Sequence, residues 1–424
     1  QRKPMSANKK PLSFEEVAAK YPDFPRLLLL KIDMHRRGVA YADRALSAFD
    51  PSVHQGGGTH IFGTRDGKLT ARPEALTLRD GTSVIATPTP FDQNPYVVNL
   101  IDDRLIVHDK NEPIDEVFFW EKPDYYDKRT SSGAIMQNVV SARPQRLYVV
   151  PNRYCHFWTQ DDGGGGCKFC DIVNNLKTQR EEIEMPTRIK IKDVGETIDE
   201  ALKEKGRFTA IALTSGSDFH GEKPFDKEVD FYIEILQAIG ERFDTERFPS
   251  QLICTALPKE QIKRIYDNTG VTSLTYNIEV FGESIFNAIC PGKAKWVGYK
   301  EWKKRLCDAV EVFGASRVNT GIVSGVELAR PFGVKSEEEG LELILGEAED
   351  LAKNGVSSVN MVWQPRPGSF LGARHNQTIG SLEYYVRLAI GLQEIRLKHN
   401  LSIDFDDYRR CGNHPDSDLA RVFQ

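Results

Sequence analysis

Three cysteines form the group of residues in this chain best suited to chemistry. Cys155, Cys167 and Cys170 have the spacing C-x11-C-x2-C, and an apolar, strand-like stretch at 147–150 precedes them. A closed structural zinc site uses four protein ligands, whereas a site that keeps one position open uses three. Thiolates also hold iron–sulfur clusters, and three of them on a four-iron cluster leave one iron free for a small molecule. The spacing predicts a metal site, and zinc with His156 as fourth ligand remains an alternative to iron and sulfur.

The composition predicts a large core and argues against a nucleic-acid partner. The chain has 424 residues, of which 40% are hydrophobic, which suits one large α/β domain with extensions or two domains. The formal net charge is −5, and no run of lysine or arginine suits a phosphate backbone. We therefore expect no nucleic-acid partner.

The sequence does not predict a membrane or secreted protein. A membrane-spanning helix needs about 20 mostly apolar residues, and the longest apolar runs, such as 27–30, are far shorter. The first residues, Gln1-Arg2-Lys3-Pro4, are polar and lack the apolar segment that follows in a signal peptide. Four of the seven cysteines are scattered, unlike a disulfide framework. We expect a cytoplasmic protein with no membrane partner.

From residue 145 onward, apolar runs alternate with amphipathic segments, which predicts strands that alternate with helices. Such alternation favours parallel strands joined by right-handed crossovers. For residues 141–376 we predict a partial (βα)6 TIM-type barrel in an α/β chain. The strands are expected at 146–150, 208–213, 251–256, 273–280, 317–323 and 357–363, and the helices at 194–205, 227–243, 259–268, 300–313 and 336–354.

The two ends of the chain have a different character. Residues 1–140 contain short helical patterns at 14–20 and 26–38, glycine-rich breaks and short alternating segments, which predict an N-terminal α+β extension. Residues 377–424 are expected to form a C-terminal helix, at 382–398, and a tail. Both end regions are candidates to cover the mouth of the barrel.

Small and polar residues follow several of the predicted strands. In parallel barrels the active site lies at the carboxyl ends of the strands, so these residues are expected on one rim. Asn277 and Glu279 should point the same way if the fourth strand continues through them. Arg366 lies between Pro365 and Pro367, whose fixed backbone favours a guanidinium held towards the cavity. The other candidates are Ser215, Gly216, Ser217, Asp218, Gly321, Gly325 and Glu327.

These residues resemble the motifs of the radical S-adenosylmethionine (SAM) superfamily, most of all its biotin synthase, hydrogenase-maturase and ThiH-like branch. The resemblance covers about residues 145–370. It implies that Cys155, Cys167 and Cys170 hold a [4Fe–4S] cluster and that Phe169 lies near the SAM adenine. The first spacing is a departure, because eleven residues separate the first two cysteines where the superfamily usually has three.

The resemblance also implies the contacts to SAM. Residues 215–218 would bind its amino group, with Ser217 where an acid is commoner. Asn277 and Glu279 would bind ribose and methionine groups. Gly321 and Gly325 match the fifth-strand signature, in which Glu327 comes one residue early. Arg366 is predicted to contact substrate or SAM, with a salt bridge that braces its loop as the alternative.

The implied reaction is reductive cleavage of SAM to methionine and a 5′-deoxyadenosyl radical. That radical would abstract hydrogen from a small-molecule substrate, leading to rearrangement, C–C bond change or dehydrogenation in cofactor or natural-product biosynthesis. An electron donor such as flavodoxin or ferredoxin and sensitivity to oxygen are implied too.

Two other functions stay open. The first is radical SAM chemistry with sulfur or methyl insertion, since Cys254 lies where biotin synthase has one ligand of an auxiliary cluster. The second is a zinc-stabilised binding protein without catalysis. Near the C-terminus, residues 409–414 (Arg-Arg-Cys-Gly-Asn-His) could meet an anionic substrate or form an ordinary surface tail.

Overall fold

A computed structural model of the chain describes residues 10–56, 72–159, 164–182, 187–372, 377, 379–403, 412–415 and 418–419. Residues 160–163, in the insert between the first two cysteines, lie outside the described residues. The same holds for Arg409, Arg410 and Cys411 of the candidate C-terminal cluster.

The larger of two sheets has seven strands, in the order β13-β12-β11-β10-β9-β8-β7. Strands β8 to β13 are parallel and follow one another in chain order, and β7 joins β8 antiparallel at one edge. The bounds are β7 Val140–Ala142, β8 Arg146–Val149, β9 Ala210–Thr214, β10 Ser250–Ile253, β11 Ser273–Thr275, β12 Val318–Ser324 and β13 Val356–Val362.

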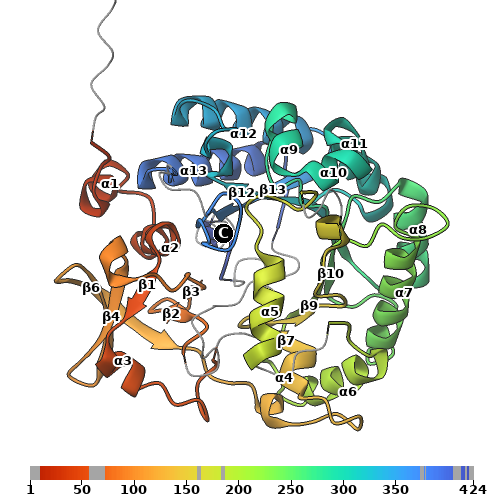
Figure 1. Cartoon of the computed structure of the whole chain (residues 1–424), viewed down its shortest axis with the longest axis horizontal. Coiled ribbons are helices and arrows are strands. Elements are labelled where there is room, and N and C mark those ends of the chain that lie inside the picture. Colours follow the sequence, from red (N-terminus) through yellow and green to blue (C-terminus); the bar gives the residue numbers. More distant parts are fainter. Residues whose placement is uncertain are drawn as a thin grey trace, which may run out of the picture.

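Helices fill the connections between these strands. In Figure 1, α6 to α8 on the right and α11 to α13 along the top form one arc around the strands, and α5 lies inside it. Their bounds are α5 Ile172–Glu182, α6 Ile191–Leu202, α7 Asp226–Gly240, α8 Lys259–Asn268, α9 Glu283–Ile289, α10 Pro291–Trp296, α11 Tyr299–Phe313, α12 Glu337–Ala352 and α13 Leu382–Lys398. The predicted α/β class is confirmed, and the curvature of a partial barrel stays a prediction.

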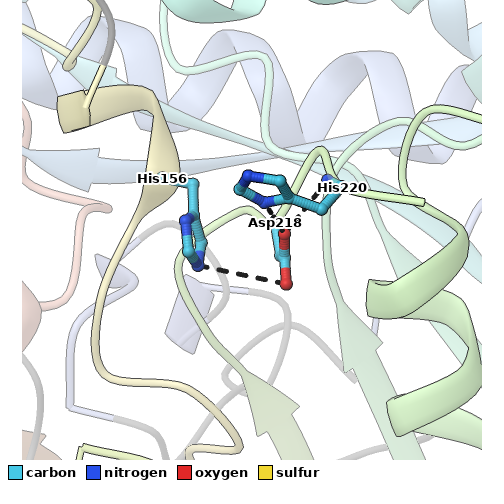
Figure 2. A group of neighbouring side chains, drawn as sticks. All are labelled: His156, Asp218 and His220. Carbon is cyan, nitrogen blue, oxygen red and sulfur yellow. Dashed lines mark hydrogen bonds and ion pairs between the residues drawn. The ribbon is translucent and has the colours of Figure 1, made fainter.

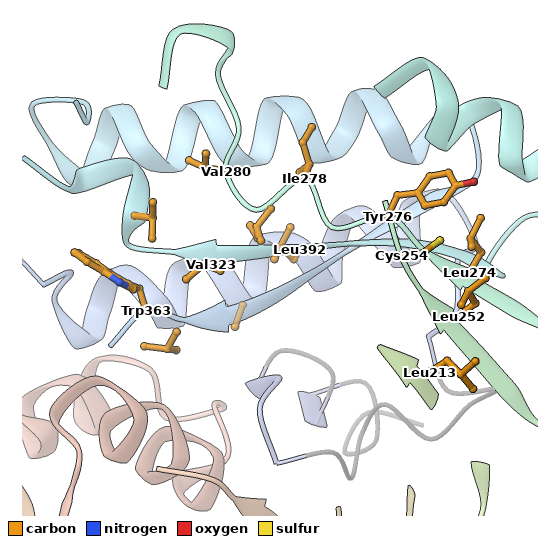
Figure 3. Packing of buried hydrophobic residues seen from close by; sticks show 14 of the residues in the cluster. Leu213, Leu252, Cys254, Leu274, Tyr276, Ile278, Val280, Val323, Trp363 and Leu392 are labelled. Carbon is orange, nitrogen blue, oxygen red and sulfur yellow. The ribbon is translucent and has the colours of Figure 1, made fainter. Parts of the chain in front are cut away.

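The alternation of side chains along the strands separates core from cavity. Leu213, Leu252 and Leu274 are partners in register on three neighbouring strands, so their side chains share one face, where all three are buried (Figure 3). The next residues along two of these strands, Thr214 and Ile253, point to the opposite face and line a cavity.

The fourth predicted strand is shorter than expected. We predicted it over 273–280, but β11 ends at Thr275, and Glu279 has a φ of 71°, which no strand residue adopts. The prediction that strand alternation orients Asn277 and Glu279 is therefore wrong. Both side chains still line the cavity, because the chain after β11 bends around β12.

The N-terminal region forms a six-stranded sheet of its own, in the order β1-β4-β5-β6-β2-β3, on the open side of the arc of helices (Figure 1). A capping box between Ser13 and Glu16 starts its first helix. Its elements are α1 Phe14–Lys20, α2 Arg26–Arg37, β1 Val39–Tyr41, α3 Asp43–Ser47, β2 Leu76–Leu78, β3 Ser83–Val84, β4 Tyr96–Ile101, β5 Arg104–Asp109, β6 Glu112–Phe119 and α4 Met136–Val139.

The N-terminal region also contacts the parallel sheet. Helix α2 packs against α13 and β13. Gln364, just after β13, accepts a hydrogen bond from Thr87 N at 3.1 Å and donates one to Met34 O at 3.5 Å. Within the described part of the chain, the helices lack the combination of length and apolar character needed to cross a bilayer.

Candidate active site

A cavity of about 300 Å³ lies at the carboxyl ends of the parallel strands, and Cys155, Cys167 and Cys170 all line it. The cysteines follow β8 in a loop in which the 3₁₀ helix His156–Thr159 comes directly after Cys155. The last two share a turn in which Cys170 N donates to Cys167 O at 3.0 Å. The structure thus brings the three predicted metal ligands to one cavity.

Two backbone hydrogen bonds fasten the cysteine loop to the segment around α9 and α10. Lys168 N donates to Ile289 O at 2.9 Å, and Gly292 N donates to Gly165 O at 2.9 Å. A Cβ atom on residue 292 would lie 2.5 Å from Gly165 O, so the close approach requires glycine there.

Gly216, after β9, supports the loop from the other side. Its ideal Cβ would lie 2.6 Å from both Cys155 Cα and Tyr154 O. Since both are backbone atoms, a larger residue could fit only if the cysteine loop moved. Gly216 N also donates to Asn152 O at 3.3 Å.

Most of the predicted SAM contacts line the same cavity as the cysteines. Asp218, Gly325 and Glu327, which the structure also describes, are not among its lining residues. Glu327 instead accepts hydrogen bonds from Gly325 N at 2.9 Å and from the hydroxyl of Tyr384 on α13. The predicted residues at the cavity are Phe169, Ser215, Gly216, Ser217, Asn277, Glu279, Gly321 and Arg366.

A buried ion pair that we did not predict lies beside the cysteines. Lys293 Nζ, on α10, is 2.9 Å from Glu279 Oε1 and donates to Asn277 O at 2.6 Å. Burial opposes the charge of Lys293, but Glu279, Cys167 and Cys290 raise its pKa above the ordinary value. In the sequence, Lys293 belongs to the segment Cys290-Pro291-Gly292-Lys293, where proline and glycine precede the lysine.

The three thiols differ in how readily they lose a proton. Burial raises the pKa of Cys155 to about 11 and that of Cys170 further, with Cys167 adding to both shifts. A hydrogen bond with the Cys290 side chain lowers the pKa of Cys167 against the effect of burial, and Lys293 assists. Half-buried thiols that repel one another as thiolates fit a cationic centre, because a bound metal stabilises the deprotonated form.

A second unpredicted group, Glu228 on α7, lies behind the cavity wall. It accepts hydrogen bonds from Asp218 N at 3.0 Å, from the Tyr232 hydroxyl at 3.0 Å and from Thr255 Oγ1 at 3.3 Å. Thr255 Oγ1 is also 2.8 Å from Ser217 Oγ, so when its one proton is donated to Glu228 it can accept a hydrogen bond from the Ser217 hydroxyl. Burial raises the pKa of Glu228 to about 7.

Two guanidinium groups line the cavity. Burial lowers the pKa of Arg366 to about 10, while nearby Cys170 opposes that shift, so the guanidinium remains a cation at neutral pH. Arg143 also lines the cavity, where it forms a buried ion pair with Glu74 at 2.6 Å.

Residues from both ends of the chain complete the cavity. His35, Glu74 and Thr87 come from the N-terminal region, and Asn413 and His414 come from the C-terminal tail. Burial lowers the pKa of both His35 and His414 to about 3, so these imidazoles are neutral near pH 7. Both regions that we considered as covers thus contribute to the wall.

The comparison with known proteins identifies one distant relative. The chain is 22% identical over 231 residues to the bacteriochlorophyllide c C-7(1)-hydroxylase of Chlorobaculum limnaeum. The match covers 52% of this chain and 54% of the relative, so the chain spans about half the length of the curated protein it matches. No protein-family model matches the chain.

Proposed function

We propose that this protein is a radical SAM enzyme that abstracts hydrogen from a small-molecule substrate. The observation that carries the proposal is that one cavity is lined by all three cysteines of the C-x11-C-x2-C motif and by eight of the eleven other site residues predicted from the sequence. The distant similarity to a hydroxylase supports an enzymatic function.

Cys155, Cys167 and Cys170 would hold the [4Fe–4S] cluster. When bound, the cluster supplies the electron that cleaves SAM to methionine and the 5′-deoxyadenosyl radical. Lys293 and the thiol of Cys290 would stabilise the Cys167 thiolate, because both lie close to its sulfur and favour the charged form. The electron would come from a one-electron donor such as flavodoxin or ferredoxin.

The residues that line the cavity suggest an orientation for SAM. Phe169 would contact the adenine, and Asn277 and Glu279 would contact the ribose and methionine groups. The Ser217 hydroxyl would accept a hydrogen bond from the amino group. Thr255 could then donate to Glu228, which lies behind Ser217 as an acid at the place where the superfamily more often has one.

The substrate would lie towards Arg366, whose guanidinium favours an anionic group such as a carboxylate. A cavity of about 300 Å³ lies at the lower end of the range for ligand sites, and it would also have to hold SAM. After hydrogen abstraction, the substrate would undergo rearrangement, C–C bond change or dehydrogenation as a step of a biosynthetic pathway.

The decisive test is anaerobic purification, reconstitution with iron and sulfide, and reduction in the presence of SAM. We expect 5′-deoxyadenosine, measured by mass spectrometry, from the wild type and none above background from Cys167→Ala, because the variant lacks one cluster ligand. If neither protein makes it and metal analysis finds one zinc and no sulfide, the proposal is wrong and a zinc-stabilised binding protein replaces it.

Cys254 favours keeping sulfur insertion as a second candidate reaction, because this buried cysteine lines the same cavity. Burial raises its pKa well above the ordinary value, which suits a neutral thiol in a wall. We therefore expect Cys254→Ala to retain the iron and sulfide content of the wild type after reconstitution. A loss of iron beyond that of one four-iron cluster would instead indicate an auxiliary cluster and favour sulfur insertion.

A further inference from the structure

We propose that His156, Asp218 and His220 form a binding site for a divalent first-row transition-metal ion, separate from the cysteine site. One ligand atom from each residue lies within 4.8 Å of the other two. Figure 2 shows both imidazole rings directed at the Asp218 carboxylate, His156 from the cysteine loop and His220 from the loop after β9. None of the three residues lines the cavity described above.

The backbone holds these residues in place before any ion binds. His156 N donates to Ser217 O at 2.8 Å, which joins the two loops directly. Asp218 N donates to the buried carboxylate of Glu228 at 3.0 Å, and Lys227 N donates to His220 O at 3.1 Å. The three donors are thus presented by a fixed scaffold, which reduces the entropy lost when they bind an ion.

Aromatic rings restrict the two imidazoles further. His220 stacks on Phe219 with ring centroids 4.6 Å apart, and Phe219 in turn stacks on Trp296 at 4.4 Å. His156 and His220 meet edge to face at 4.9 Å. The rings are packed along one side, while their nitrogens remain directed at the carboxylate.

The distances suit a shared ion better than a simple hydrogen-bonded triad. His220 Nδ1 is 2.7 Å from Asp218 Oδ1, a normal hydrogen bond, but His156 Nε2 is 3.9 Å from Asp218 Oδ2, which is too long for one. The two nitrogens face different oxygens of the carboxylate, and each separation differs by about 0.6 Å from the distance of about 3.3 Å between two ligands of a tetrahedral ion with bonds of about 2.0 Å. Small side-chain rotations would bring both nitrogens into the coordination sphere.

The donor set selects the class of ion. Two neutral imidazoles and one carboxylate carry a net charge of −1 and favour zinc, iron(II), cobalt(II) or nickel(II) over magnesium or calcium, which prefer oxygen ligands. The side chains of His156, Asp218 and His220 are 27%, 23% and 48% exposed, so an ion can enter from solvent and keep open positions for water.

A similar pair elsewhere in the chain provides a comparison. His399 Nε2 lies 2.7 Å from Glu349 Oε1, as close as His220 lies to Asp218. There the third neighbour is the ammonium of Lys398, 2.8 Å from the same oxygen, which already neutralises the carboxylate. Around Asp218, the ion pairs that the structure describes involve histidine alone. His399 is therefore a matched control.

An ion at this site would cross-link the cysteine loop to the loop after β9. His156 directly follows Cys155, and Asp218 directly follows Ser217. The ion would therefore restrict the positions of these two cavity-lining residues through their neighbours in the chain. Asp218 would thus act through the ion, in place of the direct SAM contact that the resemblance implied.

The test measures zinc binding to the full-length protein. The reconstituted wild type, His220→Ala, Asp218→Asn and His399→Ala are dialysed to equilibrium against Zn²⁺, and zinc and iron are counted per chain by mass spectrometry. We expect one more zinc in the wild type and His399→Ala than in the other two variants, whose affinity should fall by more than about 100-fold, the upper end of the cost of losing an outer-shell partner. Unchanged circular dichroism spectra and thermal unfolding midpoints show that all four proteins fold, whichever metal the cysteines carry.

The proposal is wrong if the wild type and His220→Ala bind equal amounts of zinc. It is also wrong if the control His399→Ala binds as little zinc as His220→Ala. Because the readout is a difference between variants, it stands whether the three cysteines carry an iron–sulfur cluster or a zinc ion. Failure of this site therefore leaves the radical SAM proposal untouched, and the reverse holds too.

Discussion

Replacement of Gly216 by alanine should remove most of the iron that the reconstituted protein holds. The new methyl group would lie 2.6 Å from the Cα of Cys155 and from the carbonyl oxygen of Tyr154, and neither backbone atom can move without the cysteine loop. Overpacking at such a position costs about 1–3 kcal/mol, which corresponds to a tenfold to hundredfold shift in occupancy of the correct loop conformation. Iron and sulfide per chain, with 5′-deoxyadenosine formed under reducing conditions, measure the effect.

Gly346→Ala is the matched control for this experiment. Gly346 lies in α12, and no atom outside its own turn lies within 4 Å of the position of an added Cβ. Alanine there should leave the iron content unchanged and stabilise the helix by up to about 1 kcal/mol. Full iron content in Gly216→Ala would show that the cysteine loop does not depend on this close approach.

Replacement of Glu228 by glutamine should change how the stability of the protein depends on pH. An exposed glutamate has a pKa of 4.5, and burial raises that of Glu228 to about 7. Between these values the folded chain holds a proton that the unfolded chain releases, so the free energy of unfolding falls as the pH rises from 4.5 to 7. At about 1.4 kcal/mol per pH unit, the loss amounts to about 3 kcal/mol at most.

The glutamine variant cannot ionise and avoids this loss. From pH 5 to pH 8, its free energy of unfolding should therefore rise relative to that of the wild type by about 3 kcal/mol, as measured by urea denaturation. Glu222→Gln, at an exposed carboxylate, should show no such trend. A constant difference between Glu228→Gln and the wild type would mean that the carboxylate is not held protonated.

Several elements follow from local sequence pattern. The helices at 259–268 and 382–398 have the predicted bounds, and the six parallel strands begin within two residues of the predicted apolar runs. Both results have the same cause, because the spacing of apolar residues decides which face of an element can be buried. The strand β7 was not predicted, since three residues are too few to show a period.

Site residues could be predicted where residue type and position after a strand are enough to place a side chain at the cavity. The cysteines and the residues after β9 reach the cavity because parallel strands end at one rim, a rule that needs only their order along the chain. Lys293 and Glu228 escaped prediction because each lies on a helix, where only the packing of that helix decides whether a charged side chain faces solvent or the cavity.

The sequence by itself determined the alternation of strands and helices, the three thiols and the set of polar strand ends. Only the tertiary structure decided the directions of side chains in loops. Asp218 and Glu327 lie within a few residues of cavity-lining positions, yet neither side chain lines the cavity. Asp218 contacts His220, two residues further along the same loop, and Glu327 accepts a hydrogen bond from Tyr384 on α13. Loop residues lack the fixed period of a helix or strand, so the partners available in the folded chain set their orientation.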